Sequence, residues 1–546
     1  MGLAGAAAAT AEDGADLILE HGVFYPVEPP GRVEGSLAVR GGRIAYLGPD
    51  AGAAPLRGPA TRVVDLAGRA VTPGLIDAHS HLAGLGARLA QVDLAGVPTY
   101  EEVVRRVRAA AVAIPAGGWV RGRGWDQNLW PERDFPNHAV LSAAVPDHPV
   151  WLTRVDGHAA LLNARALELL GIGAATADPA GGRILRDAAG QATGVLIDNA
   201  MDLAAGRLPV PSAAELADAL AAAARHCLER GLTTVTDMGV GQPVYEAYAG
   251  LRREGRLPLR AALFLTDDEA LLARWFERGP ELDPEARLQV RGVKLYADGA
   301  LGSRGAALVE PYADDPANLG LLVTPGERLE EVTRRALHHG FQVGVHAIGD
   351  RGALVALDAL ERAAGGARPE ARLRLEHAQV LRLQDIERLA RLGVLASVQP
   401  THATSDMPWA EARVGPVRLA GAYAWRKVLD AGGRLALGSD FPVEAADPLL
   451  GLYAAVTRQD LQGRPADGWL PAERLTREEA LRGFTLDAAY SLFLDGEVGS
   501  LAVGKRADLV VFGADPMQVP AAEIPRVPVD LVLVDGAVAF ARQGAP

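Results

Sequence analysis

The sequence Val71-Thr-Pro-Gly-Leu-Ile-Asp-Ala-His79-Ser-His81 is the stretch that decides the fold assignment. It is an apolar run that ends in two histidines separated by one residue. Side chains two positions apart on a β-strand lie on the same face, so His79 and His81 point the same way. In a barrel strand that direction can be inward, at the C-terminal mouth, where two imidazoles can share one metal ion. Alone, a His-x-His pair is a weak indication of such a site.

Short apolar runs rich in β-forming residues recur along the middle of the chain. Helical patterns lie between most of them. Eight strands with crossover helices predict a (β/α)8 TIM barrel, and a doubly wound open sheet is the alternative that a strand count does not exclude. The predicted strands are 71–76, 233–238, 260–265, 291–296, 342–346, 372–376, 394–399 and 434–438.

The distance between the first two predicted strands is too long for a plain barrel. About 155 residues separate Ile76 from Thr233, whereas a βαβ unit takes roughly 30. We therefore predict a barrel formed by residues 71–114 and 206–489, with residues 115–205 as an inserted subdomain that roofs the active site. The insertion contains Trp119, Trp125, Trp130 and Trp151.

The two ends of the chain resemble each other and differ from the middle. Both contain short alternating runs joined by turn signals such as Gly41-Gly42 and Asp535-Gly536. Neither end has enough strands for a stable sheet of its own. We predict one small β-sandwich domain built from both termini, residues 1–70 with 490–546.

Composition and charge narrow the function classes. The 546 residues are 49% hydrophobic and 23% charged, with a formal net charge of -13. This acidic balance argues against a nucleic-acid or membrane partner, since both favour a basic surface. The single cysteine, Cys227, excludes an internal disulfide and a Cys-rich zinc cluster. We expect it to be a packing residue.

The N-terminal stretch Met1–Thr10 has no basic segment before its apolar residues, so we interpret it as a frayed leader and not a signal peptide. The expected location is the cytoplasm. The expected partner is a small molecule, and a homodimer is compatible with the sequence.

Potential ligands also stand at the ends of other predicted barrel strands. Catalytic residues in barrels come from the ends of several strands. Each residue has a structural alternative, such as an ion pair for Lys294 or a helix cap for Asp440, but their joint placement favours a site. The candidates are His79, His81, Lys294, His346, His377 and Asp440.

With these residues in place, the chain resembles the amidohydrolase superfamily, and within it the amidohydrolase-3 group that includes N-substituted formamide deformylase-like enzymes. The resemblance covers nearly the whole chain. It rests on Pro73–His81, Asp156-Gly-His158, Val293–Arg304, His346–Asp350, Glu376-His377, Gln399-Pro400, Gly438–Asp440 and Gly499–Val511.

The resemblance implies a role for each candidate ligand. His79 and His81 would bind the more buried metal, and His346 and His377 the second. Lys294 would carry CO2 as a carbamate and bridge the two metals. Asp440 would touch the first metal and act as the general base. Two zinc ions are expected, with iron, manganese or cobalt as alternatives.

The resemblance also implies hydrolysis of a non-peptide C–N bond, in an amide such as an N-substituted formamide or N-acyl compound, by a metal-bridging hydroxide. Asp440 would take the proton of the bridging water and return it to the leaving nitrogen. One alternative is a cyclic amidase or deaminase on the same scaffold. Another, from a different class, is a metal-binding barrel without catalysis.

Further residues are candidates for binding the substrate, because polar groups beside aromatic side chains are typical of pockets. For Trp125, a buried anchor of the insertion is an equal alternative, and for Asp298 and Arg304, support of the site or an ordinary loop ion pair. Glu376 alternates with His377, so we expect it to point out of the barrel. The candidates are Trp125, Asp126, His158, Asp298, Arg304 and Gln399.

Overall fold

The computed structural model describes residues 14–29, 31–154, 159–179, 182–204 and 210–545. The chain divides into two compact units, one of Met1–Leu85 with Leu220–Pro546 and the other of Gly86–Ala219. The divisions fall within helices α2 (Leu82–Leu89) and α6 (Ala213–Leu228). Each unit is described by itself below.

The first unit contains the predicted barrel of parallel strands. Eight strands pair in the order β20-β19-β18-β17-β16-β14-β13-β6. A two-residue strand, β15 (Glu281–Leu282), is added antiparallel to β16. The eight are β6 (Leu75–Ser80), β13 (Leu232–Val240), β14 (Arg260–Leu265), β16 (Leu288–Tyr296), β17 (Gln342–Ala347), β18 (Arg374–His377), β19 (Leu395–Val398) and β20 (Leu435–Leu437).

The barrel closes at the ends of β6 and β20. The amide of Asp440 donates to the carbonyl of His79 at 2.7 Å, and the amide of His81 donates to Phe441 at 2.8 Å. Gly438 permits this approach, since a Cβ there would lie 2.6 Å from Oδ1 of Asp77 and 2.7 Å from the His79 nitrogen. The nearly closed barrel confirms the predicted fold of this unit.

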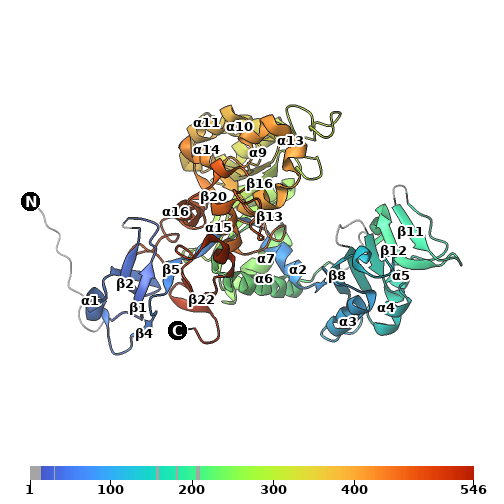
Figure 1. The fold of residues 1–546 in the computed structure, drawn as a ribbon, viewed down its shortest axis with the longest axis horizontal. Coiled ribbons are helices and arrows are strands. Elements are labelled where there is room, and N and C mark those ends of the chain that lie inside the picture. Colours follow the sequence, from blue (N-terminus) through green and yellow to red (C-terminus); the bar gives the residue numbers. More distant parts are fainter. Residues whose placement is uncertain (1–13, 30, 155–158, 180–181, 205–209, 546) are drawn as a thin grey trace, which may run out of the picture. The chain divides into compact units, whose positions relative to one another are not determined.

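Helices alternate with the barrel strands and cover their outer faces, several of them visible side by side in Figure 1. The main ones are α7 (Gln242–Arg253), α8 (Glu269–Arg278), α9 (Gly326–His338), α10 (Asp350–Ala364), α11 (Leu383–Leu392), α12 (Pro400–Asp406), α13 (Ala410–Arg418), α14 (Trp425–Asp430), α15 (Pro448–Thr457), α16 (Arg477–Gly483) and α17 (Leu486–Ser491). Helices α7 to α11 are amphipathic and bury one apolar stripe each.

Strands from both termini form a second sheet in the same unit. The order is β23-β22-β21-β5-β1-β2-β3, with β4 also paired to β1. Hydrogen bonding joins all eight in one sheet, and the two-layered sandwich stays a prediction. The strands are β1 (Leu17–Phe24), β2 (Val33–Arg40), β3 (Arg43–Gly48), β4 (Arg62–Asp65), β5 (Ala70–Pro73), β21 (Leu509–Phe512), β22 (Val529–Val534) and β23 (Ala537–Ala541).

The second unit, Gly86–Ala219, includes the whole of the predicted insertion. Its sheet has the order β11-β12-β10-β9-β8-β7, and its core contains Trp125 and Trp130. The elements are β7 (Val92–Asp93), α3 (Tyr100–Ala111), β8 (Val120–Trp125), α4 (Ala139–Ala144), β9 (Val150–Arg154), β10 (Ala159–Leu162), α5 (Ala164–Leu170), β11 (Gly182–Arg186) and β12 (Ala192–Asp198). That this unit roofs the active site stays a prediction.

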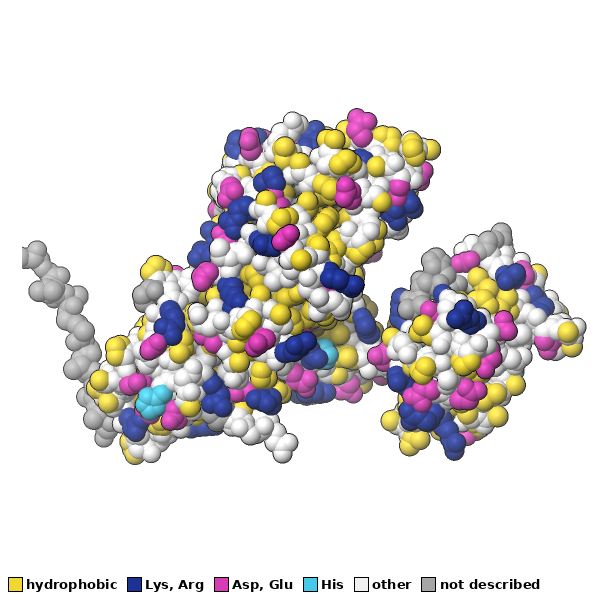
Figure 2. Space-filling model, in the orientation of Figure 1, with side chains coloured by type: hydrophobic (Ala, Val, Ile, Leu, Met, Phe, Trp, Pro, Cys, Tyr) yellow, Lys and Arg dark blue, Asp and Glu magenta, His cyan; other side chains and the backbone are white. Residues whose placement is uncertain are grey.

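Acidic and basic side chains are interspersed on the face drawn in Figure 2. Each helix in the described part of the chain is too short or too polar to cross a lipid bilayer.

Candidate metal centre

A group of buried side chains that could hold a metal ion lies where the barrel strands end. His79, His377 and Asp440 each offer one atom, and these atoms lie within 4.8 Å of one another. They come from β6, β18 and the residues after β20, which are far apart in the sequence. Only the parallel barrel brings the three strand ends together.

The other three predicted ligands lie against this group. Nε2 of His81 is 3.1 Å from Oδ1 of Asp440. Nζ of Lys294 is 3.3 Å from Nε2 of His79. The rings of His346 and His377 are 4.5 Å apart. The structure thus brings all six predicted residues to one place.

Three of the imidazoles are oriented by acceptors at Nδ1. Such partners fix the proton on Nδ1 and leave the Nε2 lone pair free for a metal. The acceptors are Glu376 Oε2 for His79 at 2.6 Å, the Met238 carbonyl for His81 at 2.9 Å, and Gln399 Oε1 for His377 at 2.8 Å. For His346 it is Nε2 that faces an acceptor, the Gly299 carbonyl at 3.4 Å, which leaves Nδ1 free.

Burial sets the protonation of these ligands. It lowers the pKa of His79 to about 4 and of His346 to about 3, with Lys294 adding to both shifts, and it lowers the pKa of His377 well below its usual value. The three imidazoles are therefore neutral near pH 7, as metal ligands must be.

Lys294 and Asp440 are shifted in directions that also suit metal binding. Burial lowers the pKa of Lys294 to about 8, which makes the neutral amine accessible. Burial raises the pKa of Asp440, but the neighbouring His81 and His79 outweigh it and keep the carboxyl ionised.

The residues present fit a divalent cation. Oδ1 of Asp440 is buried and has no hydrogen-bond partner among the described residues. It lies 3.1 Å from Nε2 of His81 and 3.6 Å from Nε2 of His79, so these three atoms of different strand ends converge. A cation bound here would accept lone pairs from two imidazole nitrogens and one carboxylate oxygen. A set of imidazole and oxygen ligands is typical of zinc.

The backbone adopts an uncommon conformation at two of the ligands. His377 has a φ of 71° and Asp440 a φ of 59°, in the left-handed region that non-glycine residues rarely occupy. Such positions persist where surrounding contacts hold them, and they cluster at functional sites.

The same feature corrects the expectation for Glu376. Glu376 is in register with His346 on the neighbouring strand and points into the barrel, where it bonds to His79 and forms an ion pair with Arg374. Strict alternation would turn His377 outward, but its positive φ turns the side chain back toward the site. The prediction that Glu376 points out of the barrel is wrong.

The predicted substrate residues have different surroundings. Asp298 is buried and accepts three backbone N–H bonds, from Ala307, Ile348 and Gly349, so it holds the loop after His346. Gln399 positions His377. Arg304 pairs with Asp314 in an exposed loop.

The remaining candidates belong to the second unit. Trp125 is fully buried in its core and its indole N–H donates to Leu152. Trp125 therefore has the surroundings of a buried anchor of the insertion, the alternative to a substrate-binding role. Asp126 caps a short 3-10 turn and pairs with Arg154. His158 lies outside the described residues.

Two buried groups near the centre are absent from the sequence predictions. Asp77 accepts hydrogen bonds from the backbone of His79 and Ser439 and from the Ser439 hydroxyl, so it ties together the two strand ends that close the barrel. His402, in α12, lies with Nε2 3.8 Å from Oδ2 of Asp440. The Pro400-Thr-His402 start of a helix directly after a barrel strand is a signal that points to His402.

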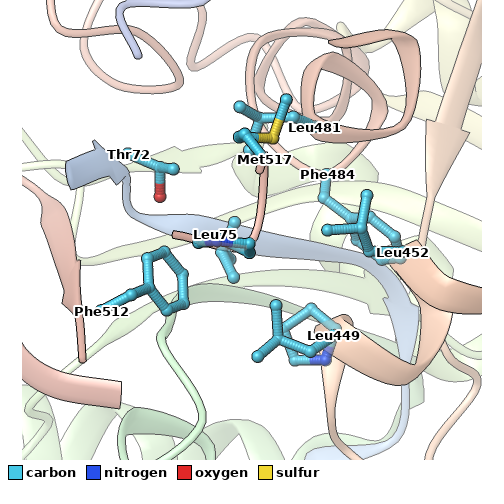
Figure 3. Close-up of a pocket in the computed structure, with 10 residues that line it drawn as sticks. Thr72, Leu75, Leu449, Leu452, Leu481, Phe484, Phe512 and Met517 are labelled. Atoms are coloured by element: carbon cyan, nitrogen blue, oxygen red, sulfur yellow. The ribbon is translucent and has the colours of Figure 1, made fainter. Parts of the chain in front are cut away.

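A separate crevice in the same unit has a different character. It has a volume of about 10 Å³, and Figure 3 shows Leu75, Leu449, Leu452 and Phe512 around it. Apart from Thr72 its labelled lining is apolar, so it lacks the ligands that a metal needs.

Comparisons with known proteins agree with this geometry. A family model described as "Amidohydrolase family" matches residues 62–540. The chain is 36% identical to Protein LONG AFTER FAR-RED 3 of Arabidopsis thaliana, over 92% of this chain and 88% of that one. It is 29% identical to N-substituted formamide deformylase of Arthrobacter pascens, over 97% and 99%.

A solved structure shows a similar fold across the chain. It is an uncharacterized metal-dependent hydrolase from Pyrococcus furiosus, with 32% identity and a TM-score of 0.78, covering 92% of this chain and 100% of that one.

Proposed function

The chain belongs to the amidohydrolase family and is a metal-dependent hydrolase of that family, and we propose that it cleaves the non-peptide C–N bond of an N-substituted formamide or another N-acyl amine. The observation that carries this proposal is the convergence of Nε2 of His79, Nε2 of His81 and Oδ1 of Asp440, with the oxygen 3.6 Å and 3.1 Å from the two nitrogens. The likeness to an N-substituted formamide deformylase over nearly both chains supports the substrate class.

We propose that His79, His81 and Asp440 hold one ion and that His346 and His377 hold a second. Zinc is the proposed metal. When bound, such ions lower the pKa of water from about 15.7 to about 7 and polarise a carbonyl oxygen. The positions of the imidazoles are fixed by Glu376, Met238 and Gln399, so the ligands are oriented before any ion binds.

We propose that Lys294 would carry CO2 as a carbamate, whose oxygens would help to hold both ions. A neutral amine reacts with CO2, and the product carries a carboxylate on a long arm. Burial that lowers the pKa of Lys294 to about 8 supplies the neutral form, and Nζ already lies 3.3 Å from Nε2 of His79.

The two oxygens of Asp440 have separate surroundings that suit separate tasks. Oδ1 faces His81 and His79, whereas Oδ2 faces His402. We assign Oδ1 to the metal and Oδ2 to the proton, which it takes from the attacking water and returns to the leaving nitrogen.

The experiment is metal analysis of the purified protein together with turnover of a panel of N-formyl amines, N-acyl amines, cyclic amides and ring amines. We expect bound divalent metal and turnover of N-formyl or N-acyl amines, with chelation abolishing it. Turnover of ring amines alone would contradict the proposal that the substrate is an amide. We also expect Lys294→Ala to lose both metal and activity, and intact mass measured after gentle desalting checks for the added CO2.

The proposed location is the cytoplasm.

A further inference from the structure

His402 is a buried histidine beside the proposed base, with no role in the metal set. Its Nε2 has no hydrogen-bond partner in the described part of the chain and lies 3.8 Å from Oδ2 of Asp440, too far for a hydrogen bond. Its ring lies nearly parallel to that of His377, with centroids 6.0 Å apart. A buried polar atom without a partner requires an explanation, because leaving it unsatisfied costs free energy.

The contacts on the other side of the ring determine which nitrogen carries the proton. Nε2 of Gln379 lies 3.2 Å from Nδ1 of His402 and 3.5 Å from Oδ2 of Asp406. The Asp406 carboxylate also accepts from the Tyr423 hydroxyl, and a carboxylate can only accept. The amide nitrogen of Gln379 is therefore the atom between them, and it donates to Nδ1 of His402.

This arrangement is the reverse of that at the metal ligands. His79, His81 and His377 each face an acceptor with Nδ1 and so leave Nε2 with a lone pair. His402 faces a donor with Nδ1, so its proton stands on Nε2. A neutral imidazole in this tautomer presents an N–H to the centre and cannot bind a metal through Nε2.

We propose that His402 is a further catalytic residue whose Nε2–H donates to the carbonyl oxygen of the scissile amide, an inference that rests on the proposed function. The donor is fixed by Gln379, is buried and adjacent to Asp440, and has no acceptor among the residues that the structure describes. A donor aimed at an oxygen that gains negative charge stabilises the transition state more than the ground state.

The test compares His402→Leu, which removes the donor, with His402→Gln, which keeps a side-chain N–H. We expect His402→Leu to lower kcat/KM by about 100-fold, mostly through kcat, as loss of one such donor does. His402→Gln should recover part of this loss. Both variants should hold as much metal as the wild type, and His339→Leu, which changes a histidine stacked on Phe276, is the matched control that should leave turnover unchanged.

A binding measurement separates the donor from other roles. Formate has a carboxylate oxygen in place of the amide carbonyl, and we expect metal-loaded His402→Leu to bind it about tenfold more weakly. Unchanged turnover would overturn the proposal, and so would loss of metal, which would make His402 a ligand. Lower turnover with unchanged formate affinity would also overturn it, because His402 would then act through Asp440.

Failure of the proposed function would give a result that can be distinguished from failure of the His402 proposal. It is shown by a metal-loaded wild type that hydrolyses no amide, whereas the formate affinities of the wild type and His402→Leu still report whether the donor meets a ligand oxygen.

Discussion

Two clusters of buried charged side chains lie at opposite ends of the barrel strands, and they differ in how completely they are paired. At the C-terminal ends, Asp440 Oδ1 and His402 Nε2 have no hydrogen-bond partner within the ranges that the structure describes. At the N-terminal start of β14, every guanidinium nitrogen of Arg260 donates, to Asp508, Asp535 and the Glu285 carbonyl.

This difference in pairing distinguishes a structural cluster from one that is suited to catalysis. The Arg260 cluster joins the barrel to the sheet formed by the termini, since Asp508 precedes β21 and Asp535 lies in the turn between β22 and β23. Its groups satisfy one another and need no ligand. The cluster at the C-terminal strand ends instead leaves polar atoms available to bind a metal ion or a substrate. In barrels of this type the C-terminal face carries activity and the opposite face stability.

The largest effect is expected from a substitution of Asp440, in the cluster at the C-terminal strand ends. We expect Asp440→Asn to lower kcat by about 10⁴-fold, the upper range for loss of a general acid–base group. Because His79 and His81 remain, much of the metal should stay bound. Steady-state kinetics and metal analysis on the same sample check both parts, and full activity would remove Asp440 as the base.

Arg260→Met tests the opposite end. Removal of the cation leaves the Asp508 carboxylate buried and unpaired, so we expect a loss of about 3–5 kcal/mol in the free energy of unfolding, measured by urea denaturation. The specific activity of the folded protein should be unchanged. Arg362→Met, which breaks an exposed pair with Glu330, is the control and should cost less than about 1 kcal/mol. Equal effects of the two substitutions would contradict the structural role of Arg260.

Glu376→Gln tests a paired charge that lies within the cluster at the C-terminal strand ends. Loss of its charge weakens the hold on Nδ1 of His79, and we expect metal affinity to fall about 10- to 100-fold. Competition with a chelator measures this. Glu370→Gln, which changes an exposed carboxylate paired with Arg368, should bind metal as the wild type does.

The smallest effect concerns pH. Burial raises the pKa of Asp535, but Arg260 and Arg287 outweigh it, so the folded-state pKa lies below the ordinary 3.8. The carboxylate therefore stabilises the fold above about pH 4, and this contribution is lost as pH falls through the folded-state pKa. We expect the Tm difference between the wild type and Asp535→Asn to be full at pH 7 and to shrink below pH 4. A constant difference would show that Asp535 does not act through its charge.

The sequence predicted the barrel, and it pointed to the residues that converge at the candidate metal centre, because both depend on local pattern. Apolar runs mark buried strands, and a histidine or aspartate at the end of such a run is visible without knowledge of its neighbours. Glu376 was misassigned because alternation presupposes regular backbone, and the φ of 71° at His377 is not written in the residue types. His402 and Arg260 went unnoticed because their roles depend on Gln379 and Asp508, partners that only the tertiary fold supplies.

The pairing of β5 with β21 also affects how the protein is made. Thr72 and Val510 are partners in this sheet, although more than four hundred residues separate them. At about 5–20 residues per second, a ribosome needs about 20–90 s to travel that distance. During this time the strand that leads into β6 and His79 has an unfilled edge, so nascent chains need protection from aggregation until synthesis ends. Proteolysis of stalled chains that lack residues 509–546 would show whether this edge is exposed.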